Sequence, residues 1–225
     1  MDEKGKAVII IKNGPYRVTG GVRLDNVRIV GDGEGGSIAW EKSGDYPRQE
    51  SFFLCRCGAS RDKPFCDGSH AKIAFDGTEQ ADNIPYAESC RIYKGDGMAL
   101  MDKEVLCAIA RYCDPHGQVW NLIMRPEDRE LAIEEACSCP AGRLTIVIDG
   151  EIIEPKLPRD ISLIDDRPEG KLGPIWVKGG IPVIGAEGVR YEPRNRVTLC
   201  RCGQSRNKPF CDGAHLQDEE ADDGE

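Results

Sequence analysis

One stretch of the chain occurs twice, and this repeat constrains the fold more than any other feature. Residues 54–70 read Leu-Cys-Arg-Cys-Gly-Ala-Ser-Arg-Asp-Lys-Pro-Phe-Cys-Asp-Gly-Ser-His, and residues 199–215 repeat them almost unchanged. Each copy holds three cysteines and one histidine at the same intervals, Cys-x-Cys-x8-Cys-x3-His, and the residues between them are mostly polar, glycine or proline. This pattern indicates a set of metal ligands rather than a piece of core. The copies differ at three positions, which are Ala59/Gln204, Asp62/Asn207 and Ser69/Ala214.

The spacing divides each set into two pairs. Cys66 and His70 are four residues apart, so a single helical turn would place the thiolate and the imidazole on one face, about 5–6 Å apart at Cβ. Asp67 is expected to cap that turn. Cys55 and Cys57 are closer in sequence than the cysteine pairs usual in tetrahedral zinc sites. Each pair therefore suits one iron of a two-iron cluster, and the second copy offers the same spacing.

The repeat resembles the CDGSH iron-sulfur family, whose name is spelled by residues 66–70 and, with alanine for serine, by residues 211–215. The resemblance implies one [2Fe-2S] cluster for each copy, held by three cysteines and one histidine. It further implies that the Cys-x-Cys pair holds the inner iron and the Cys-x3-His pair the outer one. The metal ligands that the resemblance assigns are Cys55, Cys57, Cys66, His70, Cys200, Cys202, Cys211 and His215.

Two alternatives exist for these cysteines. A pair of Cys3His zinc knuckles would use the same ligand types and would only hold the loops together. A disulfide framework fits less well, because the 11 cysteines are an odd number and nothing at the N-terminus resembles a secretory signal.

The composition of the chain indicates which partners and which cellular compartment to expect. The net charge of −9 argues against nucleic acid, whose phosphates dominate such binding. No apolar run approaches the roughly 20 residues that cross a bilayer, so no membrane association is expected. Free thiol ligands without an export signal predict a cytoplasmic location. Residues 218–225 carry six carboxylates and are expected to be a disordered tail.

The duplicated unit is larger than the ligand loop. Residues 14–22 and 173–181 share the pattern Gly-Pro-x-x-Val-x-Gly-Gly-apolar, and short apolar runs between Gly/Asp clusters predict strands over residues 7–54. In the CDGSH family, single-motif chains form two-fold dimers that share strands between protomers. The resemblance therefore implies that residues 7–75 and 172–215 build a pseudo-two-fold β assembly within one chain, which we expect to be a monomer.

A different unit lies between the copies. Asp102 is a predicted N-cap for a helix over residues 103–112, and Pro126 is predicted to open a helix over residues 127–136. Residues 143–149 and 150–153 predict a hairpin. The predicted fold class is α+β, with two β-rich CDGSH units and an inserted α+β unit. The predicted domains are residues 1–81, 82–165 and 166–216, followed by the acidic tail at 217–225.

The inserted unit contains several cysteines of its own. Cys107-x5-Cys113, followed much later by Cys139-Pro140, resembles the divergent single-cluster ferredoxins. The resemblance implies a ferredoxin-like unit with a third cluster, [3Fe-4S] or [4Fe-4S], for which Cys137 is the candidate fourth ligand. The other interpretation is a set of buried free thiols in a scaffold without metal. Cys90 is expected in the core, and His116 is expected to be solvated.

The ligand type predicts the chemistry. Iron-sulfur centres exchange single electrons, and a neutral imidazole in place of a thiolate raises the reduction potential. A histidine ligand also couples that potential to protons. We therefore expect a one-electron, proton-coupled carrier that meets a redox partner. The alternative is a store that donates [2Fe-2S] units to apo-proteins. We do not expect an enzyme, because no nucleophile-base arrangement or phosphate loop stands outside the ligand sets.

Overall fold

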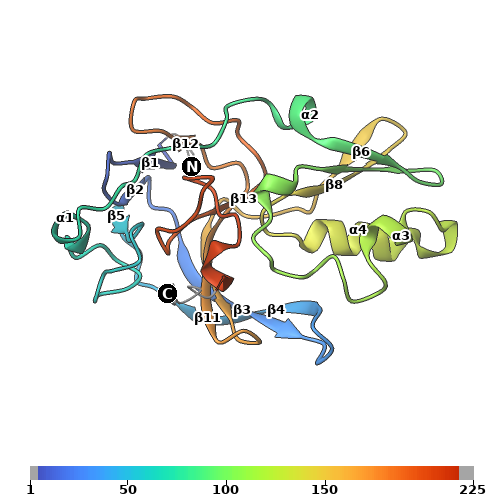
Figure 1. The fold of residues 1–225 in the computed structure, drawn as a ribbon, viewed down its shortest axis with the longest axis horizontal. Helices are drawn as coiled ribbons and strands as arrows, with labels where there is room; N and C mark the ends of the chain where they lie inside the picture. The colour runs from blue at the N-terminus through green and yellow to red at the C-terminus, as the bar shows by residue number, and fades with distance from the viewer. Residues whose placement is uncertain (1–4, 218–225) are drawn as a thin grey trace, which may run out of the picture.

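A computed structural model describes residues 5–217 of the chain (Figure 1). The fold is α+β, as the sequence predicts, and it is rich in strand, with three sheets and several short helices. The predicted acidic tail at 218–225 lies outside the described residues. Among residues 5–217, no helix combines the length and the apolar character needed to cross a bilayer.

The first sheet belongs mainly to the N-terminal copy. Its strands are β1 (Ala7–Ile10), β2 (Tyr16–Thr19), β5 (Ser51–Leu54) and β12 (Val183–Ile184), in the order β12-β1-β2-β5. Buried and more exposed side chains alternate along β1, β2 and β5, as expected for a sheet with one face on a core. The strand β12 comes from the C-terminal part of the chain and runs parallel to β1.

The second sheet has the order β13-β11-β10-β3-β4. Its strands are β3 (Leu24–Gly31), β4 (Ser37–Asp45), β10 (Ile161–Asp166), β11 (Lys171–Lys178) and β13 (Arg196–Leu199). The strands β3 and β4 come from the N-terminal copy, and β3 runs parallel to β10, which precedes the C-terminal copy. The first sheet thus contains one strand from the C-terminal part of the chain, and the second contains two strands from the N-terminal copy.

The registers of the two sheets correspond. The matching Gly-Pro blocks make Val18 the counterpart of Val177, and Leu24 the counterpart of Val183. In the first sheet, Val8 is paired with Val18 on one side and with Val183 on the other. In the second sheet, Ile161 is paired in the same way with Val177 and Leu24. Side chains from both sheets are buried in one shared core, including Val8, Leu54, Ile161 and Leu199.

The insertion forms the third sheet and most of the helical structure, at the right of Figure 1. The antiparallel strands β6 (Arg91–Lys94), β7 (Ala99–Asp102), β8 (Leu144–Ile148) and β9 (Glu151–Ile153) are adjacent in that order. The helices are α2 (Tyr86–Ser89), α3 (Val119–Leu122), the 3-10 turn η2 (Pro126–Asp128) and α4 (Arg129–Ser138). The predicted hairpin is confirmed, and the predicted helix over residues 127–136 appears as η2 followed by α4.

The predicted helix over residues 103–112 is wrong. Only the 3-10 turn η1 (Glu104–Leu106) forms there, and Ile109 and Arg111 have positive φ angles of 52° and 57°. The Asp102 carboxylate does not cap a helix but accepts hydrogen bonds from Arg143 at 2.6 and 2.9 Å. Arg111 donates to Asp166 at 2.6 Å and so ties this segment to the second sheet. Long-range contacts of this kind override the local helical pattern.

Candidate metal centres

The two repeated loops fold in the same way. In the first, the Cys55 amide donates to the Pro64 carbonyl at 2.8 Å and the Cys66 amide donates to the Phe53 carbonyl at 3.0 Å. The counterpart bonds in the second loop have lengths of 2.9 Å each, from Cys200 to Pro209 and from Cys211 to Thr198. These bonds fold each loop back on the end of its strand, β5 or β13, so that cysteines separated in sequence are brought together.

The predicted ligands lie in two close pairs within each loop. In the first loop, the sulfurs of Cys55 and Cys57 are 3.8 Å apart, and Cys66 Sγ is 3.3 Å from His70 Nδ1. In the second loop the corresponding distances are 3.6 Å between the two sulfurs and 3.5 Å between sulfur and nitrogen. The residues of the second loop that make these pairs are Cys200 with Cys202 and Cys211 with His215.

These distances fit two tetrahedral metal ions better than one. Two thiolates bound at about 2.3 Å to one tetrahedral metal lie about 3.8 Å apart, and a thiolate and an imidazole nitrogen lie about 3.5 Å apart. Within residues 5–217, no three His, Cys, Asp or Glu side chains converge on a point that could hold a single ion. The donors in each loop therefore lie in two separate pairs.

The histidine reaches its cysteine by a different route from the predicted one. Cys66 is not in a helix, because Gly68 has a left-handed conformation with φ of 85° and the short helix α1 (Ser69–Lys72) begins after it. In the second loop, Gly213 has the same φ and precedes the 3-10 turn η3 (Ala214–Leu216). A left-handed glycine, not a helical turn from the cysteine, thus sets the distance between the two ligands.

Asp67 has a role close to the predicted cap. Its carboxylate accepts the amides of Ser69 and Arg61, both at 2.9 Å, and so bridges the start of α1 to the middle of the loop. These backbone hydrogen bonds hold the pKa of Asp67 well below its usual value. Asp212 makes the same contacts in the second loop, at 3.1 Å to Ala214 and 2.8 Å to Arg206.

The arginine between the paired cysteines was not predicted to belong to the site. Arg56 is 1% exposed and donates to the carbonyls of Gly77 and Ile11. Its counterpart Arg201 donates to the carbonyl of Ile164 at 2.6 Å, and burial lowers the pKa of Arg201 to about 10. Arg201 lines the same cavity as Cys55 and Cys202, so its positive charge lies near thiols of both loops. The repeated Cys-Arg-Cys triplet was the signal that could have identified them.

The two loops touch each other through their glycines. A Cβ on Gly58 would collide with the carbonyl of Cys202, and one on Gly203 would lie 2.8 Å from the carbonyl of Cys57. A cavity of about 490 Å³ lies at this junction, and ligands of both sites line it, namely Cys55, Cys57, Cys202 and His215. The two candidate centres are therefore neighbours.

The surroundings of the second site are the more buried. Cys211 is 2% exposed, and this burial raises the pKa of its thiol far above the usual value. Burial also lowers the pKa of His215 to about 4, and its Nε2 atom is buried without a hydrogen-bond partner among the described residues. A hydrogen bond with the nearby thiol of Cys202 lowers the pKa of Cys200 to about 6.

The comparisons with known proteins agree with the geometry. Residues 13–71 and 172–216 both match the family described as iron-binding zinc finger CDGSH type. The chain therefore contains two domains of the CDGSH iron-binding type. Domains of this type bind iron-sulfur clusters. No curated protein and no solved structure gave a significant match.

Outside the two CDGSH domains, three of the inserted cysteines come together. Cys107, Cys113 and Cys139 line one cavity of about 20 Å³. Burial raises the pKa of Cys113 well above its usual value, and the neighbouring Cys139 and Cys107 contribute in the same direction. Cys137 is not among the lining residues of this cavity; its sulfur lies 4.0 Å from the carbonyl of Ile153.

Two smaller predictions concern Cys90 and His116. Cys90 is partly buried at the edge of a cluster of buried side chains, so it is only partly in the core. His116 is not simply solvated, because its Nδ1 lies 3.2 Å from Glu135 Oε1 and its side chain is 43% exposed. The buried carboxylate of Glu135, 2% exposed, holds the imidazole at the surface of the insertion.

Proposed function

We propose that each CDGSH loop holds one [2Fe-2S] cluster and that the protein carries single electrons. The observation that carries this proposal is the division of each ligand set into two pairs at distances that suit two tetrahedral irons. Such a cluster supplies one-electron chemistry when bound. The chain's own part is to place three thiolates and one imidazole for each cluster, to keep Arg201 near Cys55 and Cys202, and to hold the two sites together at Gly58 and Gly203.

We propose that the ligands are those assigned by the resemblance. Cys55, Cys57, Cys66 and His70 would hold the first cluster. The second cluster would be held by Cys200, Cys202, Cys211 and His215. The pairwise distances and the matching backbone hydrogen bonds of the two loops support both sets, and Arg201 favours them further, since a cation near the site offsets the charge gained on reduction.

We further propose that the two CDGSH units form a pseudo-two-fold assembly, and that the protein is a monomer for that reason. The corresponding registers of the two sheets support this, because each copy contributes one parallel strand to the sheet of the other. A chain that contains both halves needs no second copy to complete the arrangement. A reducing cytoplasm is the compartment that suits its free thiols. We assign the chain no catalytic role.

A third cluster in the insertion is a further part of the proposal. Cys107, Cys113 and Cys139 line one cavity, and three thiolates are enough to hold a [3Fe-4S] centre. The position of Cys137 outside that lining favours three protein ligands over four. The ferredoxin-like nature of the insertion belongs to the same proposal.

The experiment is an absorption and EPR spectrum of protein purified without oxygen, with iron and acid-labile sulfide counted. Two clusters of the two-iron type contain four irons per chain, and a loaded central site raises the count to seven or eight. Dithionite should add one electron to each [2Fe-2S] cluster. A colourless protein that contains zinc and no sulfide would refute the proposal.

The exposure of the first site favours a second candidate function. Cys66 is partly exposed, and a reachable ligand pair suits a protein that donates whole clusters. Mixing the holo-protein with an apo-ferredoxin separates the two functions. Rapid appearance of the ferredoxin spectrum supports donation, whereas intact clusters that exchange electrons quickly support electron transfer.

A further inference from the structure

The sequence differences between the two loops coincide with a difference in their surroundings. Asn207 is 7% exposed and its amide donates to the carbonyl of Val105, in the insertion, at 3.1 Å. Its counterpart Asp62 is exposed. A carboxylate cannot donate a hydrogen bond to a carbonyl, and burying it without a partner is unfavourable. The change from aspartate to asparagine therefore matches the contact with the insertion.

The left-handed glycines show the same difference. Gly213 faces the insertion, where an added Cβ would collide with the side chain of Ile109 and lie 3.3 Å from the carbonyl of Cys107. A Cβ on Gly68 would meet nothing within 4 Å. The neighbouring Ala214 is 9% exposed, whereas Ser69 in the first loop is more exposed. Alanine at this position leaves no buried hydroxyl to be paired.

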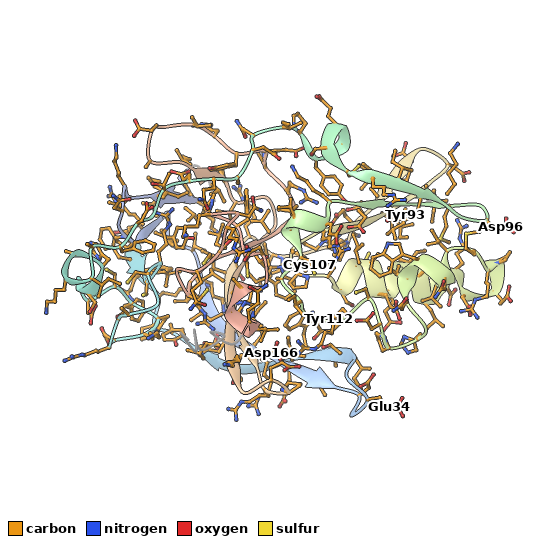
Figure 2. The ribbon with its side chains drawn as sticks, viewed as in Figure 1. Glu34, Tyr93, Asp96, Cys107, Tyr112 and Asp166 are labelled. Carbon is orange, nitrogen blue, oxygen red and sulfur yellow. The ribbon has the colours of Figure 1, made fainter. Side chains whose placement is uncertain are left out.

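A second segment, residues 80–81, also contacts the second CDGSH loop. The carbonyl of Lys208 accepts hydrogen bonds from the amides of Gln80 and Ala81 at 2.7 and 2.9 Å. Figure 1 shows the second loop, in red, between the first loop on the left and the insertion on the right. Cys107 lies near the centre of the molecule in Figure 2, within the segment that meets Gly213. Residues 80–81 and 105–109 thus lie over the second loop.

We propose that residues 80–81 and 105–109 form a cover that closes the second CDGSH site, and that molecules in solution reach the metal through the first. This rests on the proposed function, since it concerns the clusters that the loops would hold. The cover buries the outer cysteine of the second loop, since Cys211 is 2% exposed and packs against Leu106 and Ala108, whereas Cys66 of the first loop is partly exposed. The two loops, although nearly identical in sequence, thereby have different functions. The first loop exchanges its cluster with molecules in solution, and the second loop retains its cluster.

The test is the loss of visible absorbance when oxidised holo-protein is mixed with excess EDTA. We expect two phases of equal amplitude, with the second site at least about tenfold slower because its cover must open first. Asn207→Asp removes the hydrogen bond to Val105 and should speed the slow phase about tenfold. The matched control Asp62→Asn makes the same chemical exchange at the exposed position, in reverse, and should leave the fast phase unchanged.

A second variant and a second readout keep the test decisive. Ile109→Ala shortens the cover without changing the loop and should also speed the slow phase. Amide hydrogen exchange over residues 199–217 should rise in both cover variants, while exchange over residues 54–72 stays the same. A single phase in the parent protein, or a slow phase and an exchange pattern that neither variant changes, would overturn the proposal. A colourless protein would refute the proposed function alone, because amide exchange in that sample still tests the cover.

Discussion

As the proposed histidine ligands, His70 and His215 would set the charge of their sites. A thiolate brings a negative charge to its iron, whereas an imidazole bound through one nitrogen is neutral. Two-iron centres with histidine ligands accordingly have higher reduction potentials than centres with four cysteines. In both loops Nδ1 is the nitrogen beside the partner thiol, at 3.3 Å in the first and 3.5 Å in the second. Nδ1 is therefore the atom expected to bind the metal.

Replacing a ligand histidine by cysteine should lower the potential of that cluster alone. We expect His70→Cys to lower the potential of the first cluster by on the order of 100 mV, and His215→Cys that of the second. Potentiometric titration followed by EPR measures both. His116→Ala is the control, because His116 pairs with Glu135 outside both loops. Potentials that stay constant in both cysteine variants would contradict histidine ligation.

At the scale of the elements, repetition was more informative than local propensity. The matching Gly-Pro blocks predicted strands in both copies, and β2 and β11 occupy the corresponding places in their sheets. The helix predicted over residues 103–112 failed because Arg111 is held by Asp166, a residue distant in sequence. Cys55 and Cys57 could be predicted as ligands from their spacing. The contact between the two loops could not be predicted, because a local sequence pattern does not show which distant residue a glycine packs against.

The contact between the loops can be tested at Gly58. Its φ is 78° and a Cβ there would collide with the carbonyl of Cys202. Gly188 has a similar φ of 79°, and a Cβ there would meet nothing within 4 Å. Both Gly→Ala variants force alanine into the left-handed region, which costs about 1 kcal/mol. We expect Gly58→Ala to lower the thermal midpoint further than Gly188→Ala and to reduce the iron content. Equal thermal midpoints for the two variants would mean that the contact between the loops does not contribute to stability.

At the scale of the whole molecule, one buried arginine joins the insertion to the second CDGSH unit. Arg196, on β13, has a side chain that is 0% exposed and forms an ion pair with Glu154 at 2.7 Å. The same guanidinium donates to three carbonyls at the end of α4, those of Ala136, Cys137 and Cys139. A cation at a helix C-terminus is favourable, because the last carbonyls carry partial negative charge. The sequence could not predict this contact, since its partners lie far away along the chain.

Arg196→Met should destabilise the protein by about 3–5 kcal/mol, because it leaves the carbonyls at the end of α4 and the partly buried carboxylate of Glu154 without their cation. Denaturant unfolding followed by circular dichroism measures the change. Arg23→Met is the matched control: Arg23 lies 2.6 Å from Asp45, but their side chains are 39% and 51% exposed, so the midpoint should stay close to that of the parent protein. A small effect at Arg196 would mean that the insertion and the second unit are held together mainly by apolar contacts. Retention of the proposed cluster at the second site would then not depend on this ion pair.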